Sequence, residues 1–390
     1  MIHHYLNLST GEHSKMTLGD GIRRNIAKVS KEERDLFIDA IKQLNHKYYS
    51  PNGSRNEFPA GKVSYWFKQD EIHQSSHVHG CPAFLPWHRE MLNRFEELLR
   101  SVHPELSLHY WDWNEDPSNM ADNEGRPVNI FDHNFMGKAN GLVDEPLKSA
   151  GFYWENPRNQ EYRDDRSPVI LVRPNLNDPS TWKYPTTMGG QPIHCNPADP
   201  PKSLRRNKWA GPPPVGQITA GIYWATDNDL INAPSWEVFN DLMQGVEVDS
   251  NPSTNGAHAL AHSYIGGNLS DPHISFRDPF VFLVHSNVDR LWTMWQEKDP
   301  LSRLDPNRVY STQGNSKGDG DIEEGEPNWG ILSPHMPWSG WNSQTTETGI
   351  VTGVWPIRPW FPPENEKNYK NSKDVSIITP PKYDTANNFE

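Results

Sequence analysis

Apolar residues recur every three or four positions in two segments, residues 88–102 and residues 280–295, which is the spacing of an amphipathic helix. His88 lies on the apolar stripe of the first segment, so its imidazole is predicted to point into the interior. Arg89 and Glu90 are predicted to turn away from the interior. The stripe continues through Met91, Leu92, Phe95, Leu98, Leu99 and Val102.

The second segment repeats this arrangement. Asp278 followed by Pro279 predicts an N-cap with proline at the first helical position. His285 falls on the inner face of the helix. Asp289, one turn later, is predicted to be a structural carboxylate that needs a cation, because a buried charge is costly unless it is paired. The inner apolar positions are Phe282, Val288, Leu291 or Trp292, and Trp295.

Other helices are predicted from local signals. Ser30 and Glu33 form a capping box that opens a helix, and the charges at 31–34 are expected to be solvated. Residues 65–73 read as a short helix, and residues 234–243 as another. Pro82 and Pro86 predict a loop that ends where the first amphipathic helix begins, at His88. The fold class is therefore mainly α.

The remaining chain is rich in proline, glycine, asparagine and aspartate. Residues 117–234 are predicted to be a loop-rich excursion with a few short β-strands around the helical core. Residues 299–390 are predicted to form an extended segment without a separate covering domain, which would leave the site open. We expect a single domain over residues 1–390, with a core of about 22–384.

Close-spaced histidines accompany both amphipathic helices. His258 and His262 are one helical turn apart, the spacing that lets two imidazoles bind one metal ion. His79 precedes the first helix, and His73 and His77 lie shortly before it. Neither group has a cysteine or carboxylate at ligand spacing, so the pattern predicts two sites of three imidazoles, which suit zinc, copper, iron or nickel. Solitary capping or core histidines are the alternative.

At these residues the chain resembles the tyrosinases and catechol oxidases, a family with two coupled copper ions in a type 3 centre. The resemblance is carried by residues 84–89 (FLPWHR), 110–113 (YWDW), the His258-x-x-x-His262 pair, 278–279 (DP) and 285–292 (HSNVDRLW). It implies a four-helix-bundle core that holds the dicopper centre. The implied copper ligands are His73, His79, His88, His258, His262 and His285, with His73 favoured over His77.

The resemblance also implies the reaction, in which two copper ions and O2 oxidise o-diphenols or o-aminophenols to o-quinones. Relatives that hydroxylate monophenols well are credited with an acid that holds a water, and with an asparagine directly after the first histidine of the second site. Here that residue is Ala259, and the acid would be Glu247 or Asp249, so we expect slow monophenol hydroxylation. The implied substrate-binding residues are Ala259, Ser263, Pro272, His273 and Ile274.

Three other functions compete with this interpretation. A full tyrosinase would hydroxylate monophenols as well as oxidise diphenols. A dioxygen carrier would use the same six histidines but would need a shielding domain, for which residues 299–390 leave no room. A structural zinc protein would need closed four-ligand sites, often with cysteine.

Two further expectations follow from the resemblance. The cation that meets Asp289 is expected to be Arg23 or Arg24, which would also stack on Tyr383. Several relatives cross-link a cysteine to the middle histidine of the first site. Here Cys81 follows that histidine by two residues, and a buried thiol is expected instead.

Charge and composition limit the classes of molecule that are expected to bind this protein. A net charge of -13 argues against nucleic acid or an anionic membrane. Two cysteines cannot form a disulfide framework. The N-terminal residues lack the pattern of a secretory leader, and no stretch has the apolar length of a membrane span, so a cytoplasmic location is the default expectation. Small phenols and O2 are the expected partners, and the long excursion leaves a homo-oligomer open.

Overall fold

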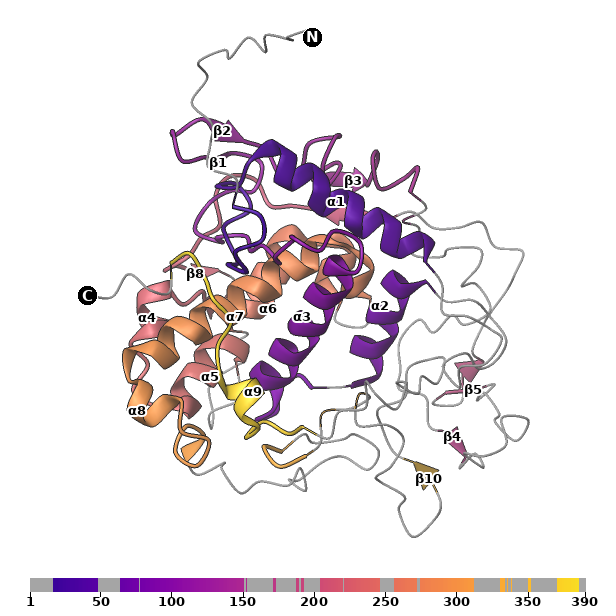
Figure 1. Ribbon diagram of the computed structural model, residues 1–390. Helices are drawn as coiled ribbons and strands as arrows, with labels where there is room; N and C mark the ends of the chain where they lie inside the picture. Colours follow the sequence, from indigo (N-terminus) through magenta and orange to yellow (C-terminus); the bar gives the residue numbers. More distant parts are fainter. Residues whose placement is uncertain are drawn as a thin grey trace, which may run out of the picture.

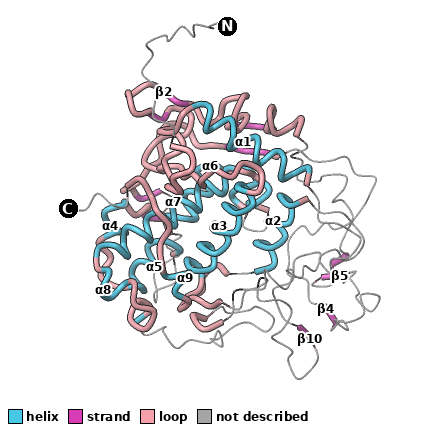
Figure 2. The backbone as a smooth tube through the Cα atoms, viewed as in Figure 1, coloured by secondary structure: helices cyan, strands magenta, loops and turns pink. Residues whose placement is uncertain are grey.

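The computed structural model is mainly helical, with short strands and long loops around a helical core (Figure 1, Figure 2). This confirms the predicted fold class. The structure describes residues 17–47, 64–76, 78–150, 152, 171–172, 187–188, 191–192, 204–219, 221–245, 256–271, 274–311, 330–333, 335, 338, 350–351 and 370–385.

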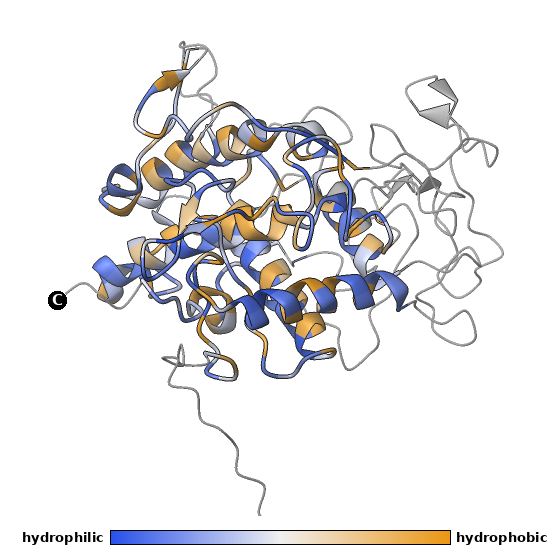
Figure 3. Ribbon diagram, turned by 90° about the horizontal axis from the view of Figure 1, so that it is seen from above, coloured by the Kyte–Doolittle hydropathy of each residue, from blue (hydrophilic) through white to orange (hydrophobic). Residues whose placement is uncertain are grey.

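Four helices form the central bundle: α2 (Tyr65–Ser76), α3 (Phe84–Arg100), α6 (Ala257–Ile265) and α7 (Phe280–Lys298). Helix α7 is buried all round, from Phe280 to Gln296, as expected of a helix in the middle of a core. The ring of its Phe282 stacks on Phe95 of α3, with 3.5 Å between centroids. Trp66 of α2 meets the same ring at 5.6 Å. In Figure 3, apolar and polar residues alternate along the helices around this core.

The other described helices pack around this bundle. Helix α1 (Lys31–His46) lies beside α2 and α3, and α5 (Trp236–Gln244) lies beside α6 (Figure 1). None of the described helices combines the length and the apolar character that crossing a bilayer requires. The short elements are α4 (Asp227–Ile231), α8 (Pro300–Arg303), α9 (Val375–Ile378) and the 3-10 turns η3 (Gly267–Ser270) and η4 (Ser275–Arg277).

The beginnings of α3 and α7 differ from their predictions by a few residues. Helix α3 begins at Phe84 rather than at His88. Pro86 does not prevent this, because it lies in the first turn, where a backbone N–H has no intrahelical acceptor. Helix α7 begins at Phe280, whose backbone N–H donates to Asp278 Oδ1 at 3.0 Å. Asp278 therefore does cap this helix.

Only half of the predicted capping box forms at the beginning of α1. The backbone N–H of Glu33 donates to the Ser30 hydroxyl at 3.1 Å. The Glu33 side chain turns inward instead of reaching back, and it accepts a hydrogen bond from the Thr17 hydroxyl. Glu33 is only 2% exposed, so its predicted solvation was wrong, and burial raises the pKa of this carboxyl.

The described strands are short and pair in antiparallel ladders, in agreement with the few short β-strands of the predicted fold class. These ladders add little to the core, because most of their residues are partly or fully exposed where burial is described. The pairs are β1 (Met120–Ala121) with β2 (Pro127–Val128), β3 (Asn140–Leu142) with β7 (Arg205–Asn207), β4 (Leu171–Val172) with β10 (Ile350–Val351), β5 (Thr187–Met188) with β6 (Gln191–Pro192), and β8 (Ile218–Thr219) with β9 (Ile222–Tyr223).

A buried charge cluster joins the ends of the core to α7. Arg23 Nη1 lies 3.1 Å from Asp289 Oδ2, and the Tyr383 hydroxyl donates to the same oxygen at 2.8 Å. Arg23 also lies over the Tyr383 ring, 5.7 Å from its centroid. The cluster is the one predicted, with Arg23 as the cation, whereas Arg24 pairs with Asp20.

The predicted outward direction of Arg89 and Glu90 was wrong. Arg89 is fully buried, donates to Asp289 Oδ1 at 2.6 Å and lies over the Trp292 ring at 3.6 Å. Glu90 is buried beside Arg94 of the next turn, at 2.7 Å. Helix α3 is enclosed on this side too, because α7 and α9 pack against it.

Candidate metal centre

The structure brings together the six histidines that the sequence analysis proposed as ligands. They form two groups, and within each group one nitrogen from every ring lies within 4.8 Å of the others. We call these groups the first triad (His73, His79 and His88) and the second triad (His258, His262 and His285). Neither triad includes a cysteine or a carboxylate among the described residues.

Each triad is assembled from different elements. In the first triad, His73 lies on α2, His88 lies on α3, and His79 lies on the loop between these helices. In the second triad, His258 and His262 lie one turn apart on α6, and His285 comes from the middle of α7. Because all four helices belong to one bundle, five of the six histidines are carried by the same helical core.

Ring nitrogens in the second triad are spaced as ligands of a shared ion would be. His285 Nε2 lies 3.3 Å from His258 Nε2 and 3.1 Å from His262 Nε2. Two nitrogens that are each about 2.0 Å from one ion, at a tetrahedral angle, lie about 3.3 Å apart. The residues therefore fit a bound metal ion.

Backbone carbonyls fix the orientation of one ring in each triad. His88 Nδ1 lies 2.8 Å from the Phe84 carbonyl oxygen, and His262 Nδ1 lies 2.7 Å from that of Leu269. A carbonyl only accepts hydrogen bonds, so Nδ1 must carry the proton and Nε2 keeps its lone pair. His88 Nε2 is buried and has no hydrogen-bond partner among the described residues. A metal ion would satisfy this nitrogen, as carbonyl-anchored histidines do in metal sites.

The two triads adjoin one another. The rings of His88 and His285 stack with 4.4 Å between centroids and 14° between planes. Across the same boundary, His79 and His258 lie 5.7 Å apart at 18°. Two ions held by these triads would therefore be neighbours, as a binuclear centre requires.

Burial lowers the pKa of the five buried histidines of the triads and so favours their neutral form. It lowers the pKa of His262 to about 4. Burial, and then the neighbouring imidazoles, lower the pKa of His73, His88, His258 and His285 well below the usual range. An unprotonated imidazole is the form that binds a metal, so the site is prepared for an ion of borderline softness such as copper.

The predicted substrate-binding residues are partly described. Ala259 and Ser263 lie on α6, each directly after a histidine of the second triad, and both are half-buried. Ile274, also half-buried, precedes η4. Their contact with substrate remains a prediction. The residues that lie outside the described part of the chain are His77, Glu247, Asp249, Pro272 and His273.

Two supports of His73 were not foreseen from the sequence. The ring of Phe276, on η4, stacks on His73 with 4.0 Å between centroids. The adjacent Arg277 donates to Asp70 Oδ2 at 2.7 Å, and Asp70 lies one turn before His73 on α2. No local pattern reveals these contacts, because η4 and α2 are about two hundred residues apart in the chain.

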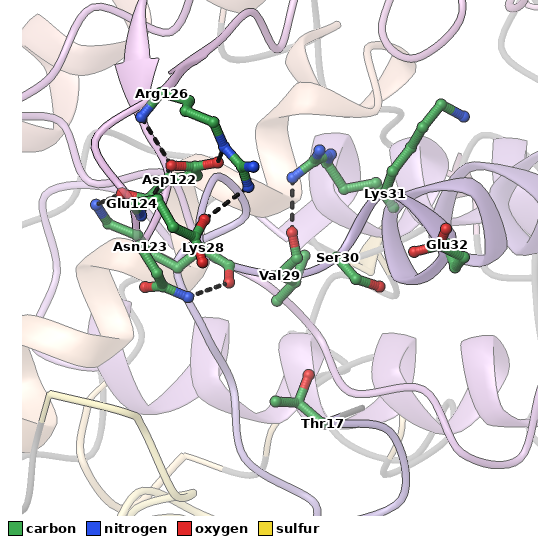
Figure 4. A pocket seen from close by; sticks show the side chains of 11 residues that line it. Thr17, Lys28, Val29, Ser30, Lys31, Glu32, Asp122, Asn123, Glu124 and Arg126 are labelled. Atoms are coloured by element: carbon green, nitrogen blue, oxygen red, sulfur yellow. Dashed lines mark hydrogen bonds and ion pairs between the residues drawn. The ribbon is translucent and has the colours of Figure 1, made fainter. Parts of the chain in front are cut away.

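A separate hollow lies between the beginning of α1 and the turn that joins β1 to β2 (Figure 4). Three of its charged residues pair with one another: Arg126 lies 2.7 Å from Asp122 and 2.6 Å from Glu124. None of the six histidines lines this hollow. We therefore assign the chemistry to the triads.

Comparison with known proteins agrees with this geometry. The family description "Common central domain of tyrosinase" matches residues 43–298. The chain is 24% identical over 302 residues to grixazone synthase from Streptomyces griseus, covering 72% of this chain and 85% of that protein. It is 25% identical over 321 residues to a tyrosinase from Streptomyces antibioticus, covering 80% of this chain and 94% of that protein.

A solved structure shares the fold. The structure of a polyphenol oxidase variant from Thermothelomyces thermophila matches with a TM-score of 0.50 and 19% identity, over 80% of this chain and 81% of that chain. The family match extends over more than half of the chain and includes both triads. This chain therefore belongs to the tyrosinase family of oxidases, which use a binuclear copper centre.

Proposed function

We propose that this protein oxidises o-diphenols or o-aminophenols to o-quinone products with O2, and that it hydroxylates monophenols slowly. The first and second triads would each hold one copper ion. The observation that carries this proposal is the pair of adjoining, all-imidazole triads in one helical bundle. When bound, two neighbouring copper ions supply the two electrons that O2 requires and recover them from the phenol.

The chain's own residues would hold and orient this centre. The carbonyls of Phe84 and Leu269 keep Nε2 of His88 and His262 directed at the metals. Phe276, fully buried, lies against His73 and 5.1 Å from the ring of His285, so it excludes water from one side of both triads. An o-diphenol reaches this site as a good reductant, and its oxidation needs no strong base.

Hydroxylation of a monophenol makes a further demand, because the phenol must lose its proton to a nearby base. A useful base has a pKa near the working pH. Burial would raise the pKa of Glu96, yet Arg23 beside it leaves that pKa below its usual value. Four further buried carboxylates of the described core also form ion pairs with arginines: Asp70, Glu90, Asp278 and Asp289.

Ala259 supports the same distinction. It directly follows His258, half-buried on α6, and its methyl group offers no hydrogen bond to hold a water or a carboxylate. Slow proton removal from a monophenol is therefore expected, while diphenol oxidation is unaffected.

Oxygen uptake by the copper-loaded protein tests the proposal. We expect rapid uptake with catechol and o-aminophenol, and a rate about 100-fold lower with 4-methylphenol, the usual size of a general-base contribution. Protein stripped of copper by a chelator is the control. Equal, lag-free rates on 4-methylphenol would show a full tyrosinase. Reversible O2 binding without turnover of any phenol would show a carrier.

A further inference from the structure

His79 is held differently from the other five histidines of the triads. It is the exposed member, and it lies on a loop rather than on a helix. The next residue, Gly80, has a φ of +70°, a left-handed conformation that favours glycine. This short loop runs from Val78 to Ala83 and ends just before α3, which begins at Phe84. Its shape decides where the His79 imidazole lies.

Gln244, the last residue of α5, binds this loop with both ends of its side-chain amide. Its Oε1 accepts the backbone N–H of Gly80 at 2.7 Å, and its Nε2 donates to the Cys81 carbonyl at 3.2 Å. Nε2 also donates to Asn240 Oδ1, one turn earlier on α5, at 2.7 Å. Asn240 is buried, so it fixes which way the Gln244 amide faces.

Two further hydrogen bonds lie within this short stretch of chain. The Cys81 thiol donates to the Val78 carbonyl at 3.0 Å, and the Phe84 N–H donates to the Cys81 carbonyl at 3.3 Å. They shape the loop but do not attach it to a distant element. Gln244 does, because it follows Gly80 by 164 residues in the chain.

The same end of α5 also presses on the beginning of α6. Gly256 is the N-cap of α6, and a Cβ atom placed there would lie 2.4 Å from the backbone carbon and oxygen of Met243. Glycine therefore allows the two helices to approach. The last turn of α5 thus touches the His79 loop with a side chain and the helix of His258 with its backbone.

We propose that Gln244 is a positioning residue for His79, and that it sets how tightly the first triad retains copper. If a loop becomes ordered only when the metal binds, its loss of conformational entropy weakens binding. The Gln244 amide orders the loop before the metal binds, so this loss no longer reduces the affinity. The second triad lies on helices and does not need this support. The inference rests on the proposed role of His79 as a ligand.

The test compares Gln244→Met and Gln244→Glu with Asp241→Asn, a control variant on the same helix that leaves the hydrogen bonds to the loop intact. Methionine has a similar length but removes both hydrogen bonds to the loop, whereas glutamate keeps the acceptor for the Gly80 N–H. In chelator competition we expect Gln244→Met to lose one of its two copper equivalents about 10- to 100-fold more readily, the usual effect of residues that support a ligand. Hydrogen exchange at the Gly80 amide should accelerate in Gln244→Met and less so in Gln244→Glu.

The metal-free form separates positioning from general stability. The melting temperature of metal-free Gln244→Met should match that of Asp241→Asn. The proposal is overturned if both copper equivalents are released in parallel with a lower melting temperature, if copper retention is unchanged, or if Gly80 exchange does not respond. His79→Ala distinguishes the two proposals: if this variant keeps both coppers, the ligand assignment fails.

Discussion

Each triad consists of three histidine side chains, but the two triads are supported in different ways. The second triad comes entirely from α6 and α7, and all of its members are buried. The first triad combines two helices with a loop, and its His79 is exposed. His88 and His262 have equivalent backbone acceptors, so the difference lies in His79. The second triad is ordered by two packed helices and the nearby Leu269 carbonyl, whereas the first triad also depends on a long-range anchor of its loop.

The difference implies an order of copper loss. The second triad keeps its shape for as long as the bundle is folded. The first can lose its loop while the bundle remains intact, because short exposed segments open locally at a lower free-energy cost than the core. Chelators are therefore expected to remove copper from the first triad before the second.

The largest effect is expected from removing a ligand of the second triad. His285→Ala deletes the ring that faces both His258 and His262. Activity on catechol should fall by more than about 100-fold, beyond the effect of residues that only support ligands. Elemental analysis should find one copper per chain. A variant that retained both coppers and turned over normally would contradict the proposed ligand set.

The second-largest effect is expected from Asp289→Asn, which should abolish the difference in copper loss between the two triads. Asp289 binds Arg23 and also Arg89 of α3, so it ties the helix of the first triad to the helix of the second. Asp289→Asn leaves these buried arginines without their full counter-charge, at an expected cost of about 3 to 5 kcal/mol in unfolding free energy. Both copper equivalents should then be lost together.

The matched control for Asp289→Asn is Asp35→Asn, which breaks an exposed pair with Lys31 on α1. Exposed pairs contribute about 0 to 1 kcal/mol, so denaturant unfolding should hardly change. Activity per bound copper pair should persist in Asp289→Asn. A stable, fully loaded but inactive protein would instead place Asp289 in the catalytic reaction.

Acid should lower the free energy of unfolding through His335, which packs near α3, the helix of His88. This residue lies buried beside α3, and burial lowers its pKa to about 4. The unfolded chain takes up a proton near pH 6.5, whereas the folded protein resists it down to about pH 4, so stability falls as the pH drops through this window. The loss is about 1.4 kcal/mol per pH unit for one such group.

His335→Gln removes this group and should make unfolding less dependent on pH by about one proton between pH 6 and 4.5. Urea titrations of the metal-free protein at several pH values measure the change. If the free energy of unfolding depended on pH equally in both proteins, His335 would take up its proton in the folded state as readily as in the unfolded chain, and the prediction would be wrong.

The smallest effect concerns substrate choice at the second triad. Ala259→Asn supplies an amide next to His258 that can hold a water or orient a carboxylate. The ratio of 4-methylphenol to catechol turnover should rise about tenfold, equivalent to about 1.4 kcal/mol. The copper content should not change. A ratio that stayed constant would show that proton removal does not limit monophenol turnover.

Sequence periodicity predicted the helices that carry His88 and His285, whereas the four-helix bundle and the choice of His73 came from the resemblance to the family. The stripes of α3 and α7 are local patterns, and His88 and His285 lie on them as predicted. The spacing of His258 and His262 likewise predicted their shared face. These features depend on residues within one helix, which is why the sequence alone reveals them.

Interactions between distant segments were not predictable in this way. Arg89 seemed to face solvent from the periodicity of α3, but its partners Asp289 and Trp292 come from α7. Gln244 gave no signal at all, since a glutamine at the end of a helix is ordinary. Its function depends on a loop that lies more than 160 residues earlier.

The joining of the two core ends has a consequence for how the chain could be divided. The backbone N–H of Arg23 donates to the Lys382 carbonyl at 2.8 Å, and the N–H of Asp384 donates to the Arg23 carbonyl at 3.1 Å. These hydrogen bonds hold the first and last segments of the core together. Dividing the chain at the exposed Gly221, between β8 and β9, would give two fragments that each contain one triad. Expressed separately, these pieces should reassemble through α3 and α7 as a split enzyme, whose phenol oxidation reports their reunion.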